Sequence, residues 1–274
     1  MPRICIDPGH NSSGFDTGAQ GNGLLEQNIT LDIGLRLKSL LETNGIQVIM
    51  TRTGGQVAGT INNVTDSLQA RCNIANNAVV DLFVAIHINA GGGTGSEVWI
   101  VSTGGRAEKA ANAVLARLIA SCGWANRGVK TANDYVLKYT DAPAILTENG
   151  FIDSVSDSAK LKDPAFIQGI AIAHAKGICD YFGIQYKEKV VIDVLNVAVL
   201  LFSKDDFWSG TDVAAKNGNC AVFVRPVDRS VPKDAMSAKH LIVVGGGSTG
   251  HPNETLLSGN TKYDTALAVK KYLG

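Results

Sequence analysis

Two of the five histidines follow short apolar runs, where imidazole side chains could hold a metal ion. His10 lies just past the first run, and His87 lies near the end of another, Leu82 to Ile88. Functional groups gather at the carboxyl ends of parallel strands, so both side chains are expected at the same edge of a sheet. Glu26 begins a helical pattern and could point back toward that edge. Two imidazoles and one carboxylate are a sufficient ligand set for catalytic Zn²⁺, which keeps a position open for water.

Each of these residues also has an interpretation without a metal. A histidine at the end of a strand can be a hydrogen-bonded structural residue, and Glu26 can stabilise the dipole of the helix that it begins. Glu148 ends a further apolar run and could serve as a general base, or it could pair with Arg71 or Arg127. The chain has no HExxH pair and these residues are far apart in sequence, so spacing alone does not decide between the alternatives.

Other polar residues near these positions are less diagnostic. Glu97 could orient a metal ligand as an outer contact or form a surface salt bridge, and Asn89 could contact substrate or satisfy a loop. We assign the three remaining histidines to structural roles: His174, His240 and His251.

The elements expected to position these side chains alternate between strands and helices. Short β-branched runs are separated by segments with apolar residues at helical spacing, which is typical of βαβ units. The expected strands are 3–7, 46–51, 82–88, 96–102 and 144–148, and the expected helices are 27–44, 67–77, 106–121 and 164–181. This pattern predicts an α/β fold with a mostly parallel sheet flanked by helices.

The length of 274 residues predicts two domains, because it exceeds one typical core. A short polar stretch interrupts the pattern, so we predict a domain at 1–184, a linker at 185–189 and a smaller α/β domain at 190–274. The second domain is expected to contain an apolar run from Val190, a helix at 211–216, strands at 221–225 and 241–244, and a closing helix at 264–273.

Charge and composition exclude several classes of function. The 25 basic and 25 acidic residues cancel, which leaves no electrostatic footprint for nucleic acid or for an anionic membrane. The longest apolar stretch, 190–202, is interrupted by Asp193 and Asn196 and is shorter than the ~20 residues of a membrane span. The five cysteines form no CxxC pair, and no leader precedes the first strand, so we expect reduced thiols and no signal peptide.

Five separated motifs share one resemblance. They are ICIDPGH at 4–10, EQN at 26–28, VAIHINA at 84–90, GSEV at 95–98 and PAILTENGFI at 143–152. In order and spacing they resemble the N-acetylmuramoyl-L-alanine amidase family, type 3, across residues 2–183. The resemblance implies a peptidoglycan hydrolase in which His10, Glu26 and His87 bind Zn²⁺ and Glu148 is the catalytic acid and base.

The implied reaction is hydrolysis of the amide between the lactyl group of muramic acid and L-alanine, with Glu148 moving a proton to the leaving amine. One position departs from the family pattern: Asn149 stands where small or apolar residues are commoner, which could alter local hydrogen bonding. A zinc carboxypeptidase that acts on the stem peptide stays open as an alternative, because it would use a similar ligand set.

Two further motifs, HLIVVGGG at 240–247 and SGNTKYDTALAVKKYL at 258–273, occur in the second domain. They resemble the type 2 cell wall binding repeat of clostridia and the carboxy-terminal domains of clostridial phage endolysins. This resemblance implies a domain that binds a wall polymer of a clostridial-type host, and it allows a homodimer through that domain. Without a leader, we expect an endolysin held in the host cytoplasm until lysis, with a host autolysin of the same family as the alternative.

Overall fold

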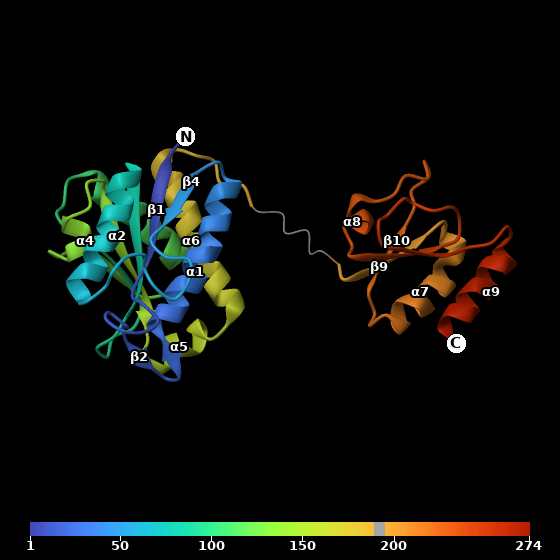
Figure 1. Cartoon of the computed structure of the whole chain (residues 1–274), viewed down its shortest axis with the longest axis horizontal. Coiled ribbons are helices and arrows are strands. Elements are labelled where there is room, and N and C mark those ends of the chain that lie inside the picture. The colour runs from blue at the N-terminus through green and yellow to red at the C-terminus, as the bar shows by residue number, and fades with distance from the viewer. Residues whose placement is uncertain (189–194) are drawn as a thin grey trace. The chain divides into compact units, whose positions relative to one another are not determined.

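The computed structural model describes residues 1–188 and 195–274 of the chain. The chain divides into two units, Met1–Lys189 and Val190–Gly274, which run from blue to yellow and from orange to red in Figure 1. Residue 189 of the expected linker and the first part of the expected apolar run from Val190 lie outside the described residues. The two units are therefore described separately.

The first unit is built on a six-stranded sheet with the order β4-β1-β5-β8-β6-β7. Neighbouring strands run parallel except β6 and β8, which are antiparallel. The strands are β1 (Arg3–Pro8), β4 (Gln47–Met50), β5 (Leu82–Asn89), β6 (Ser96–Ile100), β7 (Asn126–Thr131) and β8 (Ala144–Phe151). Helices cover both faces of this sheet, so the predicted α/β fold with a mostly parallel sheet is confirmed.

Alternation along β5 shows how the two faces are filled. Residues 82, 84, 86 and 88 pack into one core layer, whereas residues 83 and 85 pack into the other. The first layer is covered by α1 (Glu26–Thr43), α3 (Arg106–Cys122) and α6 (Pro164–Phe182), and the second by α2 (Val64–Ala78) and α4 (Tyr135–Lys138). Successive side chains of a strand point to opposite faces. His87 and Asn89 therefore project toward the layer of α2 and α4.

Several short elements were not expected from the sequence. In the first unit these are the hairpin of β2 (Gln20–Gly21) and β3 (Leu24–Leu25), the edge strand β7, the single-turn helix α4 and the helix α5 (Val155–Leu161), and in the second unit they are the helix at Lys233–Met236 and the strand at Glu254–Leu257. The β7 sequence NRGVKT has no apolar run, because an edge strand pairs on one side only and needs little burial. The long helices and buried strands differ from the expected ranges by a few residues at their ends.

The second unit contains a parallel four-stranded sheet with the order β10-β9-β11-β12. Its strands are β9 (Val197–Leu201), β10 (Ala221–Val224), β11 (His240–Val244) and β12 (Glu254–Leu257). Helices α7 (Phe207–Lys216) and α9 (Lys262–Leu273) pack on one face and α8 (Lys233–Met236) packs on the other. Helix α7 begins before the expected residue 211, because Ser203 and Asp206 form a capping box that starts a helical turn, η1 (Lys204–Asp206).

Across the described residues, no helix combines the length and apolar character needed to cross a bilayer. All five cysteines are free thiols.

Candidate metal centre

The loop after β1 holds His10 in a strained backbone conformation. Its φ of 67° is uncommon for a residue that carries a side chain. Arg71 fixes this loop by donating to the carbonyls of Pro8 and His10, both at 2.8 Å. Arg52 donates to the carbonyls of Pro8 and Gly9, both at 2.9 Å. Strain that the surrounding structure maintains is typical of functional sites, and here it sets the position of the His10 ring.

Glu26 lies between the two histidine rings. It is the first residue of α1 and only 3% exposed. Its Oε1 accepts the backbone N–H of Ile88 at 3.0 Å, and its Oε2 accepts that of Ala19 at 2.8 Å. The same carboxylate lies 3.1 Å from Nε2 of His10 and 3.1 Å from Nδ1 of His87. Backbone donors from two segments therefore aim this carboxylate at both imidazoles.

Two glycines make room for the histidine rings. His10 and His87 pack edge to face, with centroids 4.8 Å apart and planes at 81°. A Cβ atom on Gly18 would lie 2.7 Å from Cδ2 of His10, and one on Gly9 would overlap the ring of His87. Glycine is therefore required at both positions, and the backbone is shaped around the two rings.

The donor set fits a catalytic zinc ion. One ligand atom from each of His10, Glu26 and His87 lies within 4.8 Å of the others. Two imidazoles and one carboxylate supply the three protein ligands that catalytic zinc uses. Asp16 Oδ1 lies 2.7 Å from Nδ1 of His10, which leaves Nε2 facing Glu26. A carboxylate behind a ligating histidine is a common feature of zinc sites, because it fixes the tautomer and orientation of the ring.

Asp16 was not identified from the sequence. It lies in the loop after His10, accepts from Ser67 Oγ at 2.9 Å and is 3.8 Å from Arg71. The only signal was an acidic residue a few positions after a candidate ligand, in a loop whose path the sequence does not define.

The charged groups of this cluster strongly affect one another. Burial lowers the pKa of His10, but hydrogen bonds and charges from Asp16 and Glu26 outweigh it and raise that pKa to about 9. Burial would raise the pKa of Glu26, yet hydrogen bonds from His10 and His87 hold it well below its usual range. The cluster is thus built around an ionised carboxylate that attracts positive charge, as a metal site requires.

Glu148 lies beside this cluster on β8. It is the register partner of His87 on β5 and of Glu97 on β6. Its Oε2 is enclosed and has no hydrogen-bond partner within the described part of the chain. Burial raises the pKa of Glu148 well above its usual range, and the charges of Glu26 and Glu97 raise it further. Such a carboxyl group is suited to accepting and returning a proton.

Glu97 belongs to a buried ion-pair network, and its hydrogen-bond partners within the described part of the chain are residues other than the candidate metal ligands. Its carboxylate is 2% exposed. It accepts hydrogen bonds from Asn89 Nδ2 at 3.0 Å, Trp99 Nε1 at 3.1 Å, Arg127 Nε at 2.6 Å and Lys130 Nζ at 2.5 Å. Asn89 therefore binds Glu97, a contact not expected from the sequence, and its Oδ1 accepts the backbone N–H of Ala90 at 2.7 Å, which agrees with the expected role in satisfying a loop.

The two arginines considered as partners of Glu148 pair elsewhere. Arg127 pairs with Glu97, and Arg71 pairs with Asp7 at 2.6 Å. Asn149, the departure from the family pattern, donates from Nδ2 to the carbonyls of His87 at 3.0 Å and Thr147 at 3.2 Å. It therefore braces β5 against β8 next to Glu148.

The remaining histidines lie outside the cluster and have hydrogen-bond partners of their own. His174 is buried on α6 between the Ile170 carbonyl and Thr147 Oγ1. His240 Nε2 lies 2.8 Å from Thr255 Oγ1, and both ring nitrogens of His251 face backbone carbonyls. These contacts agree with structural roles.

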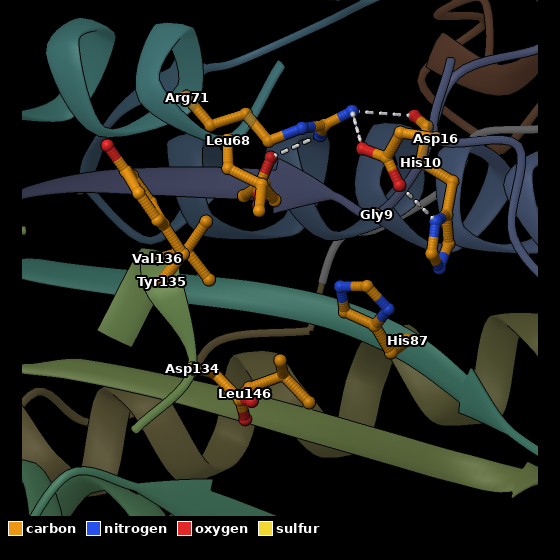
Figure 2. A pocket seen from close by; sticks show the side chains of 11 residues that line it. Gly9, His10, Asp16, Leu68, Arg71, His87, Asp134, Tyr135, Val136 and Leu146 are labelled. Atoms are coloured by element: carbon orange, nitrogen blue, oxygen red, sulfur yellow. Dashed lines mark hydrogen bonds and ion pairs between the residues drawn. The ribbon is translucent and has the colours of Figure 1, made fainter. Parts of the chain in front are cut away.

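Two adjoining cavities open beside the cluster. The first, of about 180 Å³, is lined by His10, His87 and Asp16 together with Tyr135 and other residues of α2 and α4. In Figure 2 the two histidines lie at one end of it and Tyr135 at the other. The second, of about 310 Å³, is lined by Asn89, Trp99, Ala132, Asp134, Leu146 and Glu148. Asp134 and Leu146 line both cavities, so the two cavities adjoin. His87 lines the first cavity and Glu148 lines the second.

Comparison with known proteins identifies the family of the first unit. The sequence pattern of the N-acetylmuramoyl-L-alanine amidase family matches residues 4–180. The chain belongs to this family. The matched range contains every residue of the His10, Glu26, His87 and Glu148 site.

Relatives of this amidase chain come from bacteria and from a phage. The sporulation-specific N-acetylmuramoyl-L-alanine amidase of Bacillus subtilis is 43% identical over 188 residues, covering 68% of this chain and 70% of that protein. The endolysin of Bacillus phage SPP1 is 35% identical over 192 residues, covering 67% of each. Among solved structures, the CwlD amidase of Clostridioides difficile, in complex with the GerS lipoprotein, has a TM-score of 0.62 at 27% identity, covering 67% of this chain and 99% of that one.

Proposed function

We propose that the first unit is a zinc-dependent amidase that hydrolyses the bond between the lactyl group of muramic acid and L-alanine in peptidoglycan. The observation that carries this proposal is the approach of His10, Glu26 and His87 to within 4.8 Å of one another beside Glu148. Family membership and the names of the relatives support the substrate. The chemistry of the donor set supports the metal.

When bound by His10, Glu26 and His87, Zn²⁺ would lower the pKa of a coordinated water toward ~7 and polarise a substrate carbonyl. Asp16 holds His10 so that Nε2 stays available on the side of Glu26. Arg71 and Arg52 hold the loop that carries His10. These residues orient the site before substrate arrives.

Glu148 moves the proton that the reaction requires. It accepts a proton from the attacking water as the new C–O bond forms, and its raised pKa makes it a stronger base than an ordinary carboxylate. It then delivers this proton to the amide nitrogen as the C–N bond breaks, because an amine leaves poorly unless it is protonated. The products are a lactyl carboxylate and a stem peptide with a free L-alanine amine.

Mass analysis of digested peptidoglycan tests this proposal. We expect intact stem peptides with a free amino-terminal L-alanine, together with glycan strands that carry no peptide. A chelator should abolish their release and added Zn²⁺ should restore it. Release of terminal amino acids from stems that stay attached to glycan would instead indicate a carboxypeptidase and contradict the proposal.

We further propose that the second unit binds the wall polymer of a clostridial-type host and that the chain acts as a phage endolysin, held in the host cytoplasm and released to the wall at lysis. The motifs at 240–247 and 258–273 and the endolysin among the relatives support this role. Attachment to an insoluble substrate raises the local concentration of scissile bonds without a change in the active site.

Sedimentation with purified walls tests the second role. The full chain carrying Glu148→Gln should pellet with clostridial walls, and a chain ending at residue 188 should stay mostly in solution. Equal pelleting of both proteins would show that the second unit does not anchor the chain. Analytical ultracentrifugation of the full chain would test the homodimer expected through this unit.

A further inference from the structure

The larger of the two cavities beside the metal centre has no assigned part in the reaction. His10 and His87 line only the smaller cavity, whereas Glu148 and Asn89 line only the larger one. Asp134 and Leu146 are common to both and mark where they adjoin. The site therefore has two compartments, one on the side of the histidines and one on the side of the proton carrier.

The chemistry of amide hydrolysis distinguishes the two compartments. Glu148 must reach the leaving nitrogen to protonate it, so that nitrogen lies within hydrogen-bond distance of its carboxyl group. The atoms that follow the nitrogen belong to L-alanine and the rest of the stem peptide. They consequently enter the cavity that Glu148 lines, and the lactyl group and sugar lie on the other side.

We propose that the larger cavity is the stem-peptide subsite and that Lys130, supported by Arg127, recognises a carboxylate on the second residue of the stem. This inference rests on the proposed amidase function and adds a specificity-determining residue to it. A carboxyl group on that residue can be either free or converted to a carboxamide. The ligand is thus a peptide carboxylate that one chemical change converts to a neutral amide.

The charge around Glu97 supports recognition of an anion. Both Arg127 Nε and Lys130 Nζ bond the same oxygen, Oε2 of Glu97, so one buried carboxylate faces two cations. The Glu97 side chain is 2% exposed, whereas those of Arg127 and Lys130 are 35% and 33% exposed. These three groups therefore carry one net positive charge, and both cations are more exposed than the carboxylate that they share.

Lys130 is not among the residues that line the cavity, but it packs against Trp99, which is. The two residues are register partners on β7 and β6, and Lys130 Nζ lies 5.1 Å from the centroid of the Trp99 ring, which lines the cavity. Asp134 is a second acidic residue on the cavity wall beside Glu148, but it is exposed, so solvent and salt screen any charge that it carries. An apolar ring with an ammonium group at its face fits a short peptide with a carboxylate.

Two matched substrates test the inference. They are purified glycan strands with identical stem peptides, except that the second residue carries a free α-carboxyl group in one and a carboxamide in the other. We expect the unmodified enzyme to have about fivefold higher kcat/KM on the free carboxylate, the size expected for a partly exposed charge pair. The difference should appear in KM, since Lys130 contacts neither the metal ligands nor the reacting atoms.

Substitutions at Lys130 separate charge from structure. Lys130→Met should remove the preference by raising KM for the free carboxylate to that for the amidated substrate, and Lys130→Arg should retain the preference. Lys109→Met, an exposed lysine on α3, is the control and should behave like the unmodified enzyme. Circular dichroism and zinc content would verify that each variant is folded.

The outcomes are distinguishable. Equal kcat/KM on the two substrates for the unmodified enzyme would overturn the subsite while leaving the amidase function intact, and this comparison needs no variant. A preference that persists in folded Lys130→Met would also overturn the role of Lys130. Failure of the unmodified enzyme to cleave either substrate at the lactyl amide would instead contradict the proposed function.

Discussion

Glu97 and Glu148 lie directly opposite each other on the antiparallel strands β6 and β8, yet their carboxyl groups have contrasting surroundings. Burial would raise the pKa of Glu97, but hydrogen bonds from Lys130 and Arg127 lower it. Among the residues that the structure describes, Glu148 Oε2 has no such partner, and burial raises the pKa of this side chain. The surroundings thereby separate two acids on one face of a sheet into a fixed anion and a carboxyl group suited to carrying a proton, which is how environments assign acid and base roles.

Replacement of Glu148 by glutamine should abolish turnover while sparing the metal. Glutamine keeps the size of the side chain and removes its ability to carry a proton, so kcat should fall by about 10³-fold. Zinc content should stay at one ion per chain, because Glu148 is not one of the three clustered ligands. The measurements are release of soluble wall fragments and elemental analysis. Glu42→Gln, at an exposed position of α1, is the control. Near-normal activity of Glu148→Gln would contradict its role.

Asp16→Asn should weaken zinc binding without changing the ligand set. The amide cannot stabilise the His10 tautomer and orientation as the carboxylate does, so affinity should fall by about 10–100-fold. Competition with a chromogenic chelator measures this affinity directly. Asp32→Asn removes an acid of α1 that pairs at the surface with Arg36, and it should leave the affinity unchanged. Equal affinities in both variants would show that Asp16 does not support the site.

The sequence predicted those parts of the site that depend on strand ends. The buried runs before His10 and His87 have strong apolar patterns, and parallel strands bring their carboxyl ends together. Glu26 was predicted for a related reason, because it begins the helix that follows the first loop. The roles of these residues as ligands came from family resemblance and stay predictions until a metal is measured.

The contacts missed from sequence depend on loops and cross-strand neighbours. The position of Asp16 follows from a glycine-containing loop whose path is set by Arg71 and Ser67, residues far away in the chain. The partners of Glu97 come partly from β7, an edge strand without an apolar signal. Pairings of this kind depend on register and tertiary packing, which local patterns do not encode.

Gly18→Ala and Gly14→Ala should differ in their effect on the metal site. Both glycines have positive φ values, 73° and 77°, so an alanine at either position carries similar backbone strain. At Gly18 the new Cβ would contact the His10 ring, whereas at Gly14 no atom of residues 1–188 or 195–274 lies within 4 Å of the new Cβ. Gly18→Ala should therefore lower stability by about 1–3 kcal/mol beyond Gly14→Ala and weaken zinc binding. Thermal unfolding with and without zinc measures both effects, and equal results for the two variants would refute the contact.

His174 should make the first unit less stable in mild acid. Its ring is fully buried, with Nδ1 donating to the Ile170 carbonyl at 2.9 Å and Nε2 lying 3.0 Å from Thr147 Oγ1. Burial lowers the pKa of His174 to about 4, although the hydrogen bond to Ile170 opposes this shift. In the unfolded chain the pKa of a histidine is about 6.5. Between these values the unfolded chain binds a proton that the folded chain does not, so stability falls as the pH falls through this window.

The size of this effect follows from the difference between the two pKa values. About 1.4 kcal/mol per pKa unit gives a loss of about 3 kcal/mol between neutral pH and pH ~4, below which the folded chain also binds the proton and the loss stops growing. Urea unfolding should therefore be measured at pH 7 and pH 4.5 on protein treated with a chelator. The free energy of unfolding should drop more between these pH values for the unmodified chain than for His174→Gln. Comparing the two proteins cancels the titration of all other groups, including the metal ligands. Equal drops in the free energy of unfolding for both proteins would contradict the prediction, because they would mean that the pKa of His174 is not lowered in the folded chain.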